Sequence, residues 1–290
     1  MSKKLQDMDD IARDARMKKE AENITKRLSH IRHKILVMSG KGGVGKSSIA
    51  AYLAVSLAGR GYRVGLMDVD LHGPSIPRLL GLKGKLLTDG PEGKTFPARY
   101  LPKLEVMSIE VLLGDKDAAT IWRGPLKGGV IRQFIADIEW MELDYLIIDS
   151  PPGTGDEPLT VAQTIPDAKA LVVTTPQEIS LADVRKSINF CRKMNMEVLG
   201  LVENMSGLKC PYCGKTIDLF KNMGGMITAK KENLRLLGSL PIEPKVVECG
   251  DSGSIDFLGD DSLEYNRAFG QIVDTIEKVL DRQRGTKITL

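Results

Sequence analysis

The sequence predicts an α/β fold in which helices cover both faces of a doubly wound, mostly parallel β-sheet. Strand-like and helical patterns alternate along most of the 290 residues, which is the order that a parallel sheet with crossover helices requires. Hydrophobic residues make up 42% of the chain and aromatic residues only 5%, so the core must be mainly aliphatic. The length suffices for one large α/β domain or two small ones.

The expected elements follow the chain in a regular order. Strands are predicted at residues 34–38, 63–68, 104–112, 145–149, 170–174 and 198–203, and helices at residues 46–58, 124–138, 157–165 and 181–194. Residues 81–102, rich in Gly, Pro and Lys, are expected to form an exposed loop or hairpin. The last elements are a helix at 226–232, a strand at 236–240 and a helix at 263–282, whose apolar face we assign to the core.

Composition divides the chain into three parts. Residues 1–32 are predicted as a charged, helical or mobile extension, residues 33–284 as the main domain with an insertion at 207–225, and residues 285–290 as a tail. Acidic residues are interleaved with basic ones in the extension, which favours a solvated helix over a nucleic-acid-binding arm.

Charge, hydropathy and cysteine content exclude several classes of protein. The net charge of +3 is too small to indicate nucleic-acid binding. No apolar run approaches the roughly 20 residues of a membrane span, and the N-terminus lacks an apolar signal core. Four unevenly placed cysteines do not resemble a secreted disulfide framework. We therefore expect a cytoplasmic protein with no nucleic-acid partner and no membrane partner.

A phosphate-binding loop is predicted at residues 40–47, which read GKGGVGKS and fit the P-loop pattern G-x-x-x-x-G-K-[ST]. An apolar strand precedes the loop and an Ala-rich helix follows it. Glycines remove the Cβ atoms that would keep phosphate oxygens from the backbone N–H groups, and the helix dipole favours an anion there. Lys46 would bridge the β- and γ-phosphates of a nucleotide, and Ser47 would ligate Mg²⁺. The alternative is a glycine-rich turn without a ligand.

The expected nucleotide-binding residues of this segment are Gly40, Lys41, Gly42, Gly43, Val44, Gly45, Lys46, Ser47 and Ser48.

Carboxylates follow two of the expected strands. Asp68 and Asp70 lie on one side of an extended segment, so one can support Mg²⁺ while the other orients an attacking water. Asp149 ends an apolar strand in the manner of a Walker B aspartate, which holds Mg²⁺, usually through water. Pro and Gly residues at 151–155 suggest a switch segment. The alternatives are solvated acids at strand ends and an ordinary Pro/Gly turn.

A third strand end carries a candidate for base recognition. The amide of Asn204 can pair with the donor and acceptor edge of adenine, and Pro241 and Glu243 lie in a segment that would form the other wall of the base site. Asn204 as a plain turn residue is an equally good interpretation of the sequence.

The cysteines offer one pair at ligand spacing. Cys210 and Cys213 form C-x-x-C in a turn, and two thiolates do not close a four-coordinate site. A two-fold dimer would supply the other two thiolates, and four thiolates fit zinc or a [4Fe–4S] cluster equally well by count. A redox pair is less favoured because no thioredoxin-like helix follows the motif. Cys191 is expected to be an ordinary buried thiol, and Cys249 a loop cysteine that could assist the pair.

Five motifs occur in an order that resembles a known family. Along the chain they read GKGGVGKSS, MDVDLHGPSIP, IWRGPL, DYLIIDSPPGTGDEPLT and CPYC. Together they are similar to the Mrp/ApbC-type P-loop ATPases, which carry iron–sulfur clusters and belong to the MinD/ParA group with a deviant Walker A motif. The resemblance covers roughly residues 34–282. One branch of the family has a four-cysteine N-terminal cluster site, which this sequence lacks, so no second cluster is expected.

The resemblance implies roles for individual residues. Lys41 would reach across a face-to-face dimer to the partner's nucleotide, although it could instead add charge to its own site. Asp70 would position the attacking water while Asp68 supports Mg²⁺, and Asn204 would contact the base. For Cys210 and Cys213 the resemblance favours an iron–sulfur cluster over zinc.

The function that the resemblance implies is a homodimeric ATPase that uses ATP and Mg²⁺, binds a labile [4Fe–4S] cluster between its subunits and passes it to apo iron–sulfur proteins. One alternative is a ParA/MinD-like positioning ATPase without a cluster. Another is a zinc-bridged dimer with vestigial ATPase activity.

Overall fold

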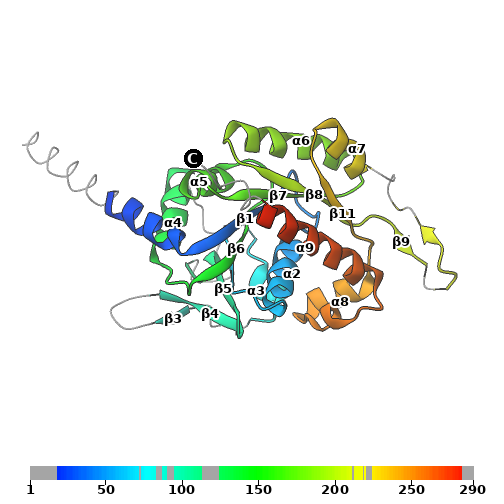
Figure 1. The fold of residues 1–290 in the computed structure, drawn as a ribbon, viewed down its shortest axis with the longest axis horizontal. Helices are drawn as coiled ribbons and strands as arrows, with labels where there is room; N and C mark the ends of the chain where they lie inside the picture. The colour runs from blue at the N-terminus through cyan, green and yellow to red at the C-terminus, as the bar shows by residue number, and fades with distance from the viewer. Residues whose placement is uncertain are drawn as a thin grey trace, which may run out of the picture.

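The computed structural model describes residues 18–71, 73–82, 87–89, 95–112, 124–210, 212–217, 219 and 224–282. In this part of the chain a nine-stranded sheet has the strand order β11-β8-β7-β1-β6-β2-β5-β4-β3 (Figure 1). Its strands are β1 (Ile31–Ser39), β2 (Val64–Asp68), β3 (Leu87–Asp89), β4 (Thr95–Leu101), β5 (Leu104–Ser108), β6 (Leu143–Asp149), β7 (Lys169–Thr174), β8 (Val198–Glu203) and β11 (Leu236–Ser239). All neighbours from β11 to β5 pair in parallel, which confirms the predicted mostly parallel sheet.

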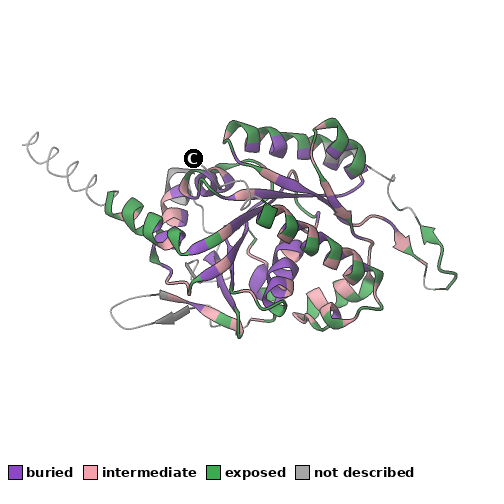
Figure 2. Cartoon of the chain, viewed as in Figure 1, coloured by how far each residue is buried: buried purple, intermediate pink, exposed green. Residues whose placement is uncertain are grey.

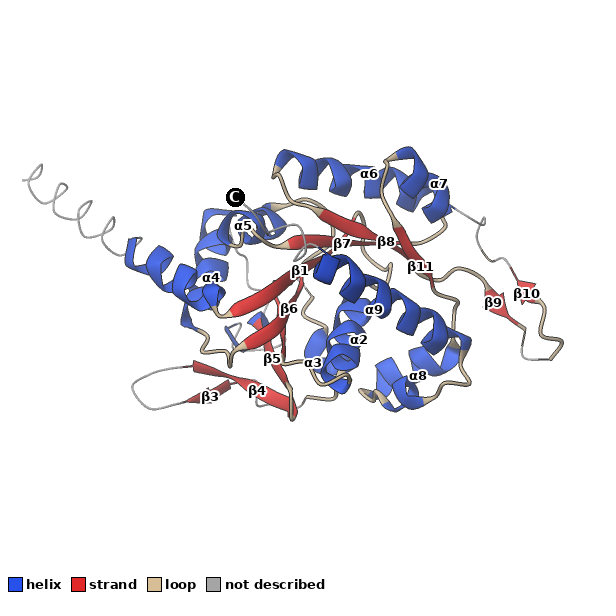
Figure 3. Cartoon of the chain, in the orientation of Figure 1, coloured by secondary structure: helices blue, strands red, loops and turns tan. Residues whose placement is uncertain are grey.

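Helices cover both faces of the sheet (Figure 3). They are α2 (Lys46–Gly59), α3 (Ile76–Leu79), α4 (Gly124–Asp137), α5 (Asp156–Thr164), α6 (Glu178–Lys193), α7 (Gly224–Lys231), α8 (Pro244–Ser252) and α9 (Glu264–Arg282), with 3₁₀ turns η2 (Ile109–Leu112) and η3 (Asp256–Gly259). One hydrophobic cluster contains α2 and α9, and the other contains α4, α5 and α6. The sheet is therefore doubly wound, as predicted.

The central strand β1 shows why the sequence forms a sheet buried on both faces. Ile35 and Val37 belong to the cluster on one face, and Leu36 and Met38 to the cluster on the other. All four are fully buried, because successive side chains of a strand point to opposite faces and helices cover both. β1 pairs with β6 on one side and β7 on the other, so the direction of winding reverses at this strand. In such sheets ligands bind beyond the carboxyl ends of the strands at that point.

Several expected elements differ in extent or were missed. The strand expected at 104–112 ends at Ser108, whose hydroxyl accepts a hydrogen bond from the Glu110 N–H and so turns the chain into η2. Within residues 81–102, β3 and β4 pair antiparallel, in agreement with the expected hairpin. The sequence did not predict α3, which has only four residues, or α8, a nine-residue helix whose Val246 and Cys249 pack against the core but are only partly buried.

The N-terminal extension is partly integrated into the fold. Residues 18–29 form a helix whose Ile24 and Leu28 are buried in the second core cluster. Because β1 begins at Ile31, the predicted boundary between residues 32 and 33 falls inside a strand. Residues 1–17 and the expected tail at 285–290 lie outside the described residues. None of the helices in the described ranges is long and apolar enough to span a membrane.

A small hairpin carries the cysteine pair and stands apart from the main sheet (Figures 1 and 3). Its strands are β9 (Leu208–Lys209) and β10 (Thr216–Ile217), which pair antiparallel. Its residues are mostly exposed, unlike those of the central strands (Figure 2). Tyr212 in its turn is 97% exposed. We call residues 206–225 the cysteine segment.

Candidate functional site

The phosphate-binding loop connects β1 to α2 at the carboxyl edge of the sheet. Gly43 and Gly45 have φ angles of 75° and 84°, in the left-handed region that favours glycine. Gly45 is also the N-cap of α2 and has no side chain to cap the helix, and the first turn of α2 contains no acidic residue. The free N–H groups and the positive end of the helix dipole therefore suit a phosphate group.

Lys46 and Asp149 join the loop to the end of β6. The Lys46 ammonium lies 2.5 Å from Asp149 Oδ1 and 3.1 Å from the Ser47 hydroxyl. Lys46 is 6% exposed and Asp149 is fully buried, and burial raises the pKa of Asp149 against the opposing effect of the Lys46 charge. The second oxygen of Asp149 is buried without a hydrogen-bond partner. A buried carboxylate oxygen beside a serine hydroxyl is the donor set that Mg²⁺ prefers, so these residues fit the ion.

Asp68 lies next to Asp149, because β2 and β6 pair with these two residues in register. Its carboxylate accepts hydrogen bonds from the Asp70 N–H at 3.0 Å, the Ile76 N–H at 3.4 Å and the Ser108 hydroxyl at 3.3 Å. Burial, followed by the nearby Asp149 charge, raises the pKa of Asp68 well above that of an ordinary carboxyl. Asp68 thus shapes the loop after β2, and its support of Mg²⁺ stays a prediction.

Asp70 and Lys41 lie at the same edge of the sheet but on different loops. Asp70 is 7% exposed, and its carboxylate accepts a hydrogen bond from the Gly73 N–H at 3.2 Å. The Lys41 ammonium donates to the Gln177 side-chain oxygen at 2.8 Å, and Gln177 is the N-cap residue of α6. Sequence reasoning missed Gln177, since only its position before a helix marks it. The roles of Asp70 and Lys41 in hydrolysis stay predictions.

Asn204 is bound to the phosphate-binding loop itself. Its amide donates to the Val44 carbonyl at 3.0 Å, and its backbone N–H donates to Thr174 at 2.8 Å. A Cβ atom at position 45 would lie 2.3 Å from the Asn204 amide nitrogen, so the glycine there makes room for this contact. Asn204 is therefore more than a plain turn residue, and its contact with a base stays a prediction.

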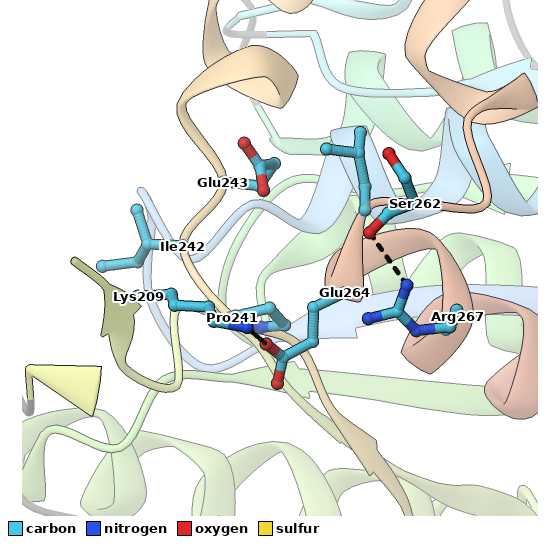
Figure 4. A pocket seen from close by; sticks show the side chains of 8 residues that line it. Lys209, Pro241, Ile242, Glu243, Ser262, Glu264 and Arg267 are labelled. Atoms are coloured by element: carbon cyan, nitrogen blue, oxygen red, sulfur yellow. Dashed lines mark hydrogen bonds and ion pairs between the residues drawn. The ribbon is translucent and has the colours of Figure 1, made fainter. Parts of the chain in front are cut away.

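Pro241 and Glu243 line a small pocket between the base of the hairpin and the start of α9 (Figure 4). The pocket has a volume of about 140 Å³ and is lined by Lys209, Pro241, Ile242, Glu243, Ser262, Leu263, Glu264 and Arg267. The Glu243 carboxylate accepts a hydrogen bond from the Lys245 N–H and caps α8. The Lys209 ammonium and a carboxylate oxygen of Glu264, both at the pocket, lie 3.8 Å apart and form an ion pair.

The Cys210–Cys213 turn is built to present thiolates. The Gly214 N–H donates to the Cys210 carbonyl and the Cys210 N–H donates to Lys215, both at 2.9 Å. Backbone N–H groups of Cys213 and Tyr212 and the Cys213 side chain hydrogen-bond to the Cys210 thiol and lower its pKa. Cys210 is half-buried and Cys213 is exposed. Among the described residues, no group of three or more His, Cys, Asp or Glu side chains could hold a metal ion.

The other two cysteines face the core. Cys191 is fully buried in α6, as expected, and burial raises its pKa to about 12. Cys249, expected in a loop, instead lies in α8 and packs against the cluster that contains α2. This difference arises because α8 was not recognised in the sequence.

Comparison with known proteins identifies the family. The ParA family model, described as NUBPL iron-transfer P-loop NTPase, matches residues 30–277. An iron–sulfur cluster carrier protein from Methanocaldococcus jannaschii is 46% identical over 88% of this chain and 88% of its own. The cytosolic Fe–S cluster assembly factor CFD1 from Kluyveromyces lactis is 46% identical over 86% of this chain and 92% of its own.

Solved structures agree with this assignment. A nucleotide-binding protein from Archaeoglobus fulgidus in complex with ADP superposes with a TM-score of 0.73 at 39% identity, covering 86% of this chain and 95% of its own. The cell division ATPase MinD from Pyrococcus furiosus has the same fold, with a TM-score of 0.62 at 23% identity over 85% of this chain and 99% of its own. The chain therefore belongs to the ParA family of NUBPL-type iron-transfer P-loop NTPases.

Proposed function

We propose that this chain is an ATPase that holds a [4Fe–4S] cluster between the cysteine pairs of two copies and passes it to apo iron–sulfur proteins. The observation that carries the proposal is the pair of half-buried Cys210 and exposed Cys213 on a hairpin of a P-loop NTPase, with no third ligand near it in the described residues. Relatives that share nearly half of their residues with this chain are named iron–sulfur cluster carriers or assembly factors.

The nucleotide half of the proposal rests on the loop at the carboxyl edge of the sheet. Lys46 would turn its charge to the β- and γ-phosphates of ATP. Ser47 and Asp149 would hold Mg²⁺, which supplies charge neutralisation at the phosphates. Asp70 would accept a hydrogen bond from the attacking water and orient it toward the γ-phosphate. Lys41 would act on the nucleotide of the second copy.

The cluster half rests on two properties of the hairpin. The first property is the lowered pKa of the Cys210 thiol, which makes this group available as a thiolate, the form that binds iron. A second copy brings the same two cysteines to the interface, because a two-fold axis places a patch against itself. Exposed apolar residues of the cysteine segment and the adjoining helix would be covered by that copy; they are Tyr212, Ile217, Leu219, Met226 and Ile227.

Anaerobic reconstitution tests the proposal. The wild-type protein is reconstituted with iron and sulfide, and its iron, sulfide and zinc contents are measured together with its mass in solution. We expect about four irons per two chains, because a [4Fe–4S] cluster takes four thiolates. Cys210→Ser and Cys213→Ser should each abolish the cluster, since each change removes two of the four ligands of a dimer.

Cys249→Ser provides the matched control. It makes the same chemical change at a half-buried thiol outside the hairpin, and the cluster content should stay unchanged. Full iron and sulfide content in the Cys210/Cys213 double variant would disprove the cluster site. Stoichiometric zinc without iron, in protein purified without oxygen from iron-replete cells, would favour the zinc-bridged dimer instead.

A further inference from the structure

The two residues at the end of β8 connect the nucleotide site to the cysteine segment. Glu203 is 2% exposed and Asn204 is 8% exposed, and they are adjacent in the chain. Asn204 donates to the Val44 carbonyl of the phosphate-binding loop, as described above. Glu203 is a buried carboxylate that the nucleotide chemistry does not use, so its contacts require another explanation.

Glu203 holds both ends of the cysteine segment. One carboxylate oxygen accepts a hydrogen bond from the Ser206 hydroxyl at 2.9 Å, at the start of the segment. The other accepts from the Gly225 N–H at 2.5 Å, at the end of the segment and in the first turn of α7. The Ser239 hydroxyl, on the edge strand β11, donates to the first oxygen at 3.2 Å. Hydrogen bonds to a buried carboxylate are among the strongest in proteins, so the segment is anchored at this residue.

Two glycines allow these side chains to make their contacts. A Cβ atom at position 225 would lie 2.7 Å from the Glu203 carboxylate, and one at position 45 would lie 2.3 Å from the Asn204 amide nitrogen. Both distances are too short for any other residue without a shift of the neighbour. The contact of Asn204 with the phosphate-binding loop and the contact of Glu203 with the cysteine segment therefore each depend on a glycine, which has no side chain to block them.

The backbone between these contacts is in an unfavourable conformation. Met205 has a φ angle of 58°, in the left-handed region, which a residue with a side chain rarely adopts. The neighbouring contacts hold it there, since the Asn204 and Ser206 backbone N–H groups donate to Thr174 and Leu240 at 2.8 Å each. A shift of the phosphate-binding loop that loosens the Asn204 contact would allow the Met205 backbone to relax. The start of the cysteine segment, which follows Met205 directly, would then change position.

We propose that Glu203 and Asn204 form a joint through which a nucleotide in the phosphate-binding loop changes the orientation and reactivity of the Cys210–Cys213 turn. Glu203 acts as a positioning residue, because its carboxylate binds Ser206 and Gly225 and so fixes both ends of the segment that bears the thiols. The joint rests on the proposed function in one respect, namely that the Cys210–Cys213 turn is the site that binds the cluster. It makes a prediction about the thiols that holds with or without a bound cluster.

The test measures the alkylation rates of Cys210 and Cys213 in the Cys249→Ser background, with and without Mg²⁺ and a slowly hydrolysed ATP analogue. Peptide mass spectrometry follows each thiol separately. We expect the nucleotide to change the rates about fivefold, which is the lower end of couplings between two sites. Ser206→Ala and Gly225→Ala should each reduce this change to near unity, because each detaches one end of the segment from Glu203.

Ser239→Ala is the matched control. It removes a hydroxyl that donates to the same oxygen of Glu203 as Ser206, but it lies on the edge strand and not in the cysteine segment. Its response to nucleotide should equal that of the parent. Glu203→Gln, which keeps the volume and one oxygen, should give an intermediate response. Nucleotide affinity, measured on every variant, should stay unchanged in Ser206→Ala and Gly225→Ala.

Two results would overturn the joint. One is a parent protein whose thiol reactivity does not respond to the nucleotide that it binds. The other is a full response in Ser206→Ala and Gly225→Ala, equal to that of Ser239→Ala. The thiol measurement needs no iron, so it is independent of cluster binding. A failure of cluster binding would refute the proposed function and leave the joint intact. A thiol response that is absent in a protein that binds the cluster would refute the joint alone.

Discussion

The two chemical regions of this molecule are built in opposite ways. At the carboxyl edge of the sheet, Lys46 is 6% exposed and Asp149 is fully buried, and the two side chains pair with each other. On the hairpin, Cys213 is exposed and Tyr212 is 97% exposed. Phosphate chemistry requires fixed charges shielded from water, whereas a group that is handed to another protein must be reachable. In the proposed function, one chain meets both needs by placing the cysteine pair on a hairpin outside the central sheet.

The largest expected effect concerns hydrolysis at the buried region. Asp70→Asn should slow ATP hydrolysis by about 10³-fold while nucleotide binding persists, because a positioned carboxylate contributes rate rather than affinity. Steady-state phosphate release and equilibrium binding of a fluorescent nucleotide measure the two quantities. A variant that loses affinity and rate equally would show that Asp70 belongs to the binding cradle.

Lys41 extends this experiment to the second copy. Lys41→Ala should impair hydrolysis through the partner's site, although its ammonium contacts Gln177 of its own chain. Mixed dimers of Lys41→Ala and Asp70→Asn contain one composite site with both residues intact, so activity should recover in part. No recovery at any mixing ratio, with mixed dimers shown to form, would assign Lys41 to its own site.

A smaller effect is expected for the affinity of ATP. Lys46→Ala should weaken ATP binding by about 10²-fold, because the loop loses the point charge that would contact the β- and γ-phosphates. Lys34→Ala is the matched control, since Lys34 is also buried and pairs with Asp167 at 2.6 Å, outside the phosphate-binding loop. Isothermal calorimetry should find the control affinity close to that of the wild type.

The same variant separates the two regions. Lys46→Ala should still accept a cluster during reconstitution, because Cys210 and Cys213 lie on a separate hairpin. If the cluster content falls as steeply as the ATP affinity, the hairpin depends on the nucleotide site for its structure and not only for its regulation.

The sequence predicted the strands that carry the motifs better than the contacts between their ends, and the reason is physical. The phosphate-binding loop and Asp149 follow apolar strands, so motif and periodicity agree there. Two hydrogen bonds join residues that are far apart in the chain, one from Asn204 to Val44 and one from Gly225 to Glu203. No local pattern in the sequence encodes such contacts. α8 was missed for a different reason, because a short helix whose apolar residues are only partly buried gives a weak periodic signal.

The smallest effect concerns the acidity of one thiol in the exposed region. The N–H groups of Cys213 and Tyr212 donate to Cys210 and lower its pKa, so its thiolate persists to lower pH than that of an ordinary cysteine, whose pKa is about 8.5. The midpoint of Cys210 alkylation should therefore lie at a lower pH in the folded protein than in the urea-unfolded chain, where the turn and its hydrogen bonds are absent. Cys191, with its pKa raised to about 12 by burial, should stay unlabelled at neutral pH.

Substitutions at Tyr212 isolate the cause of this shift. Tyr212→Pro removes one N–H donor to the thiol, so the midpoint of Cys210 alkylation should move up in pH. Tyr212→Ala keeps the N–H and removes a side chain that is 97% exposed, so the midpoint should not move. Equal midpoints in the two variants would mean that the Tyr212 N–H does not contribute to the acidity of Cys210, which would then be set by the N–H and the side chain of Cys213.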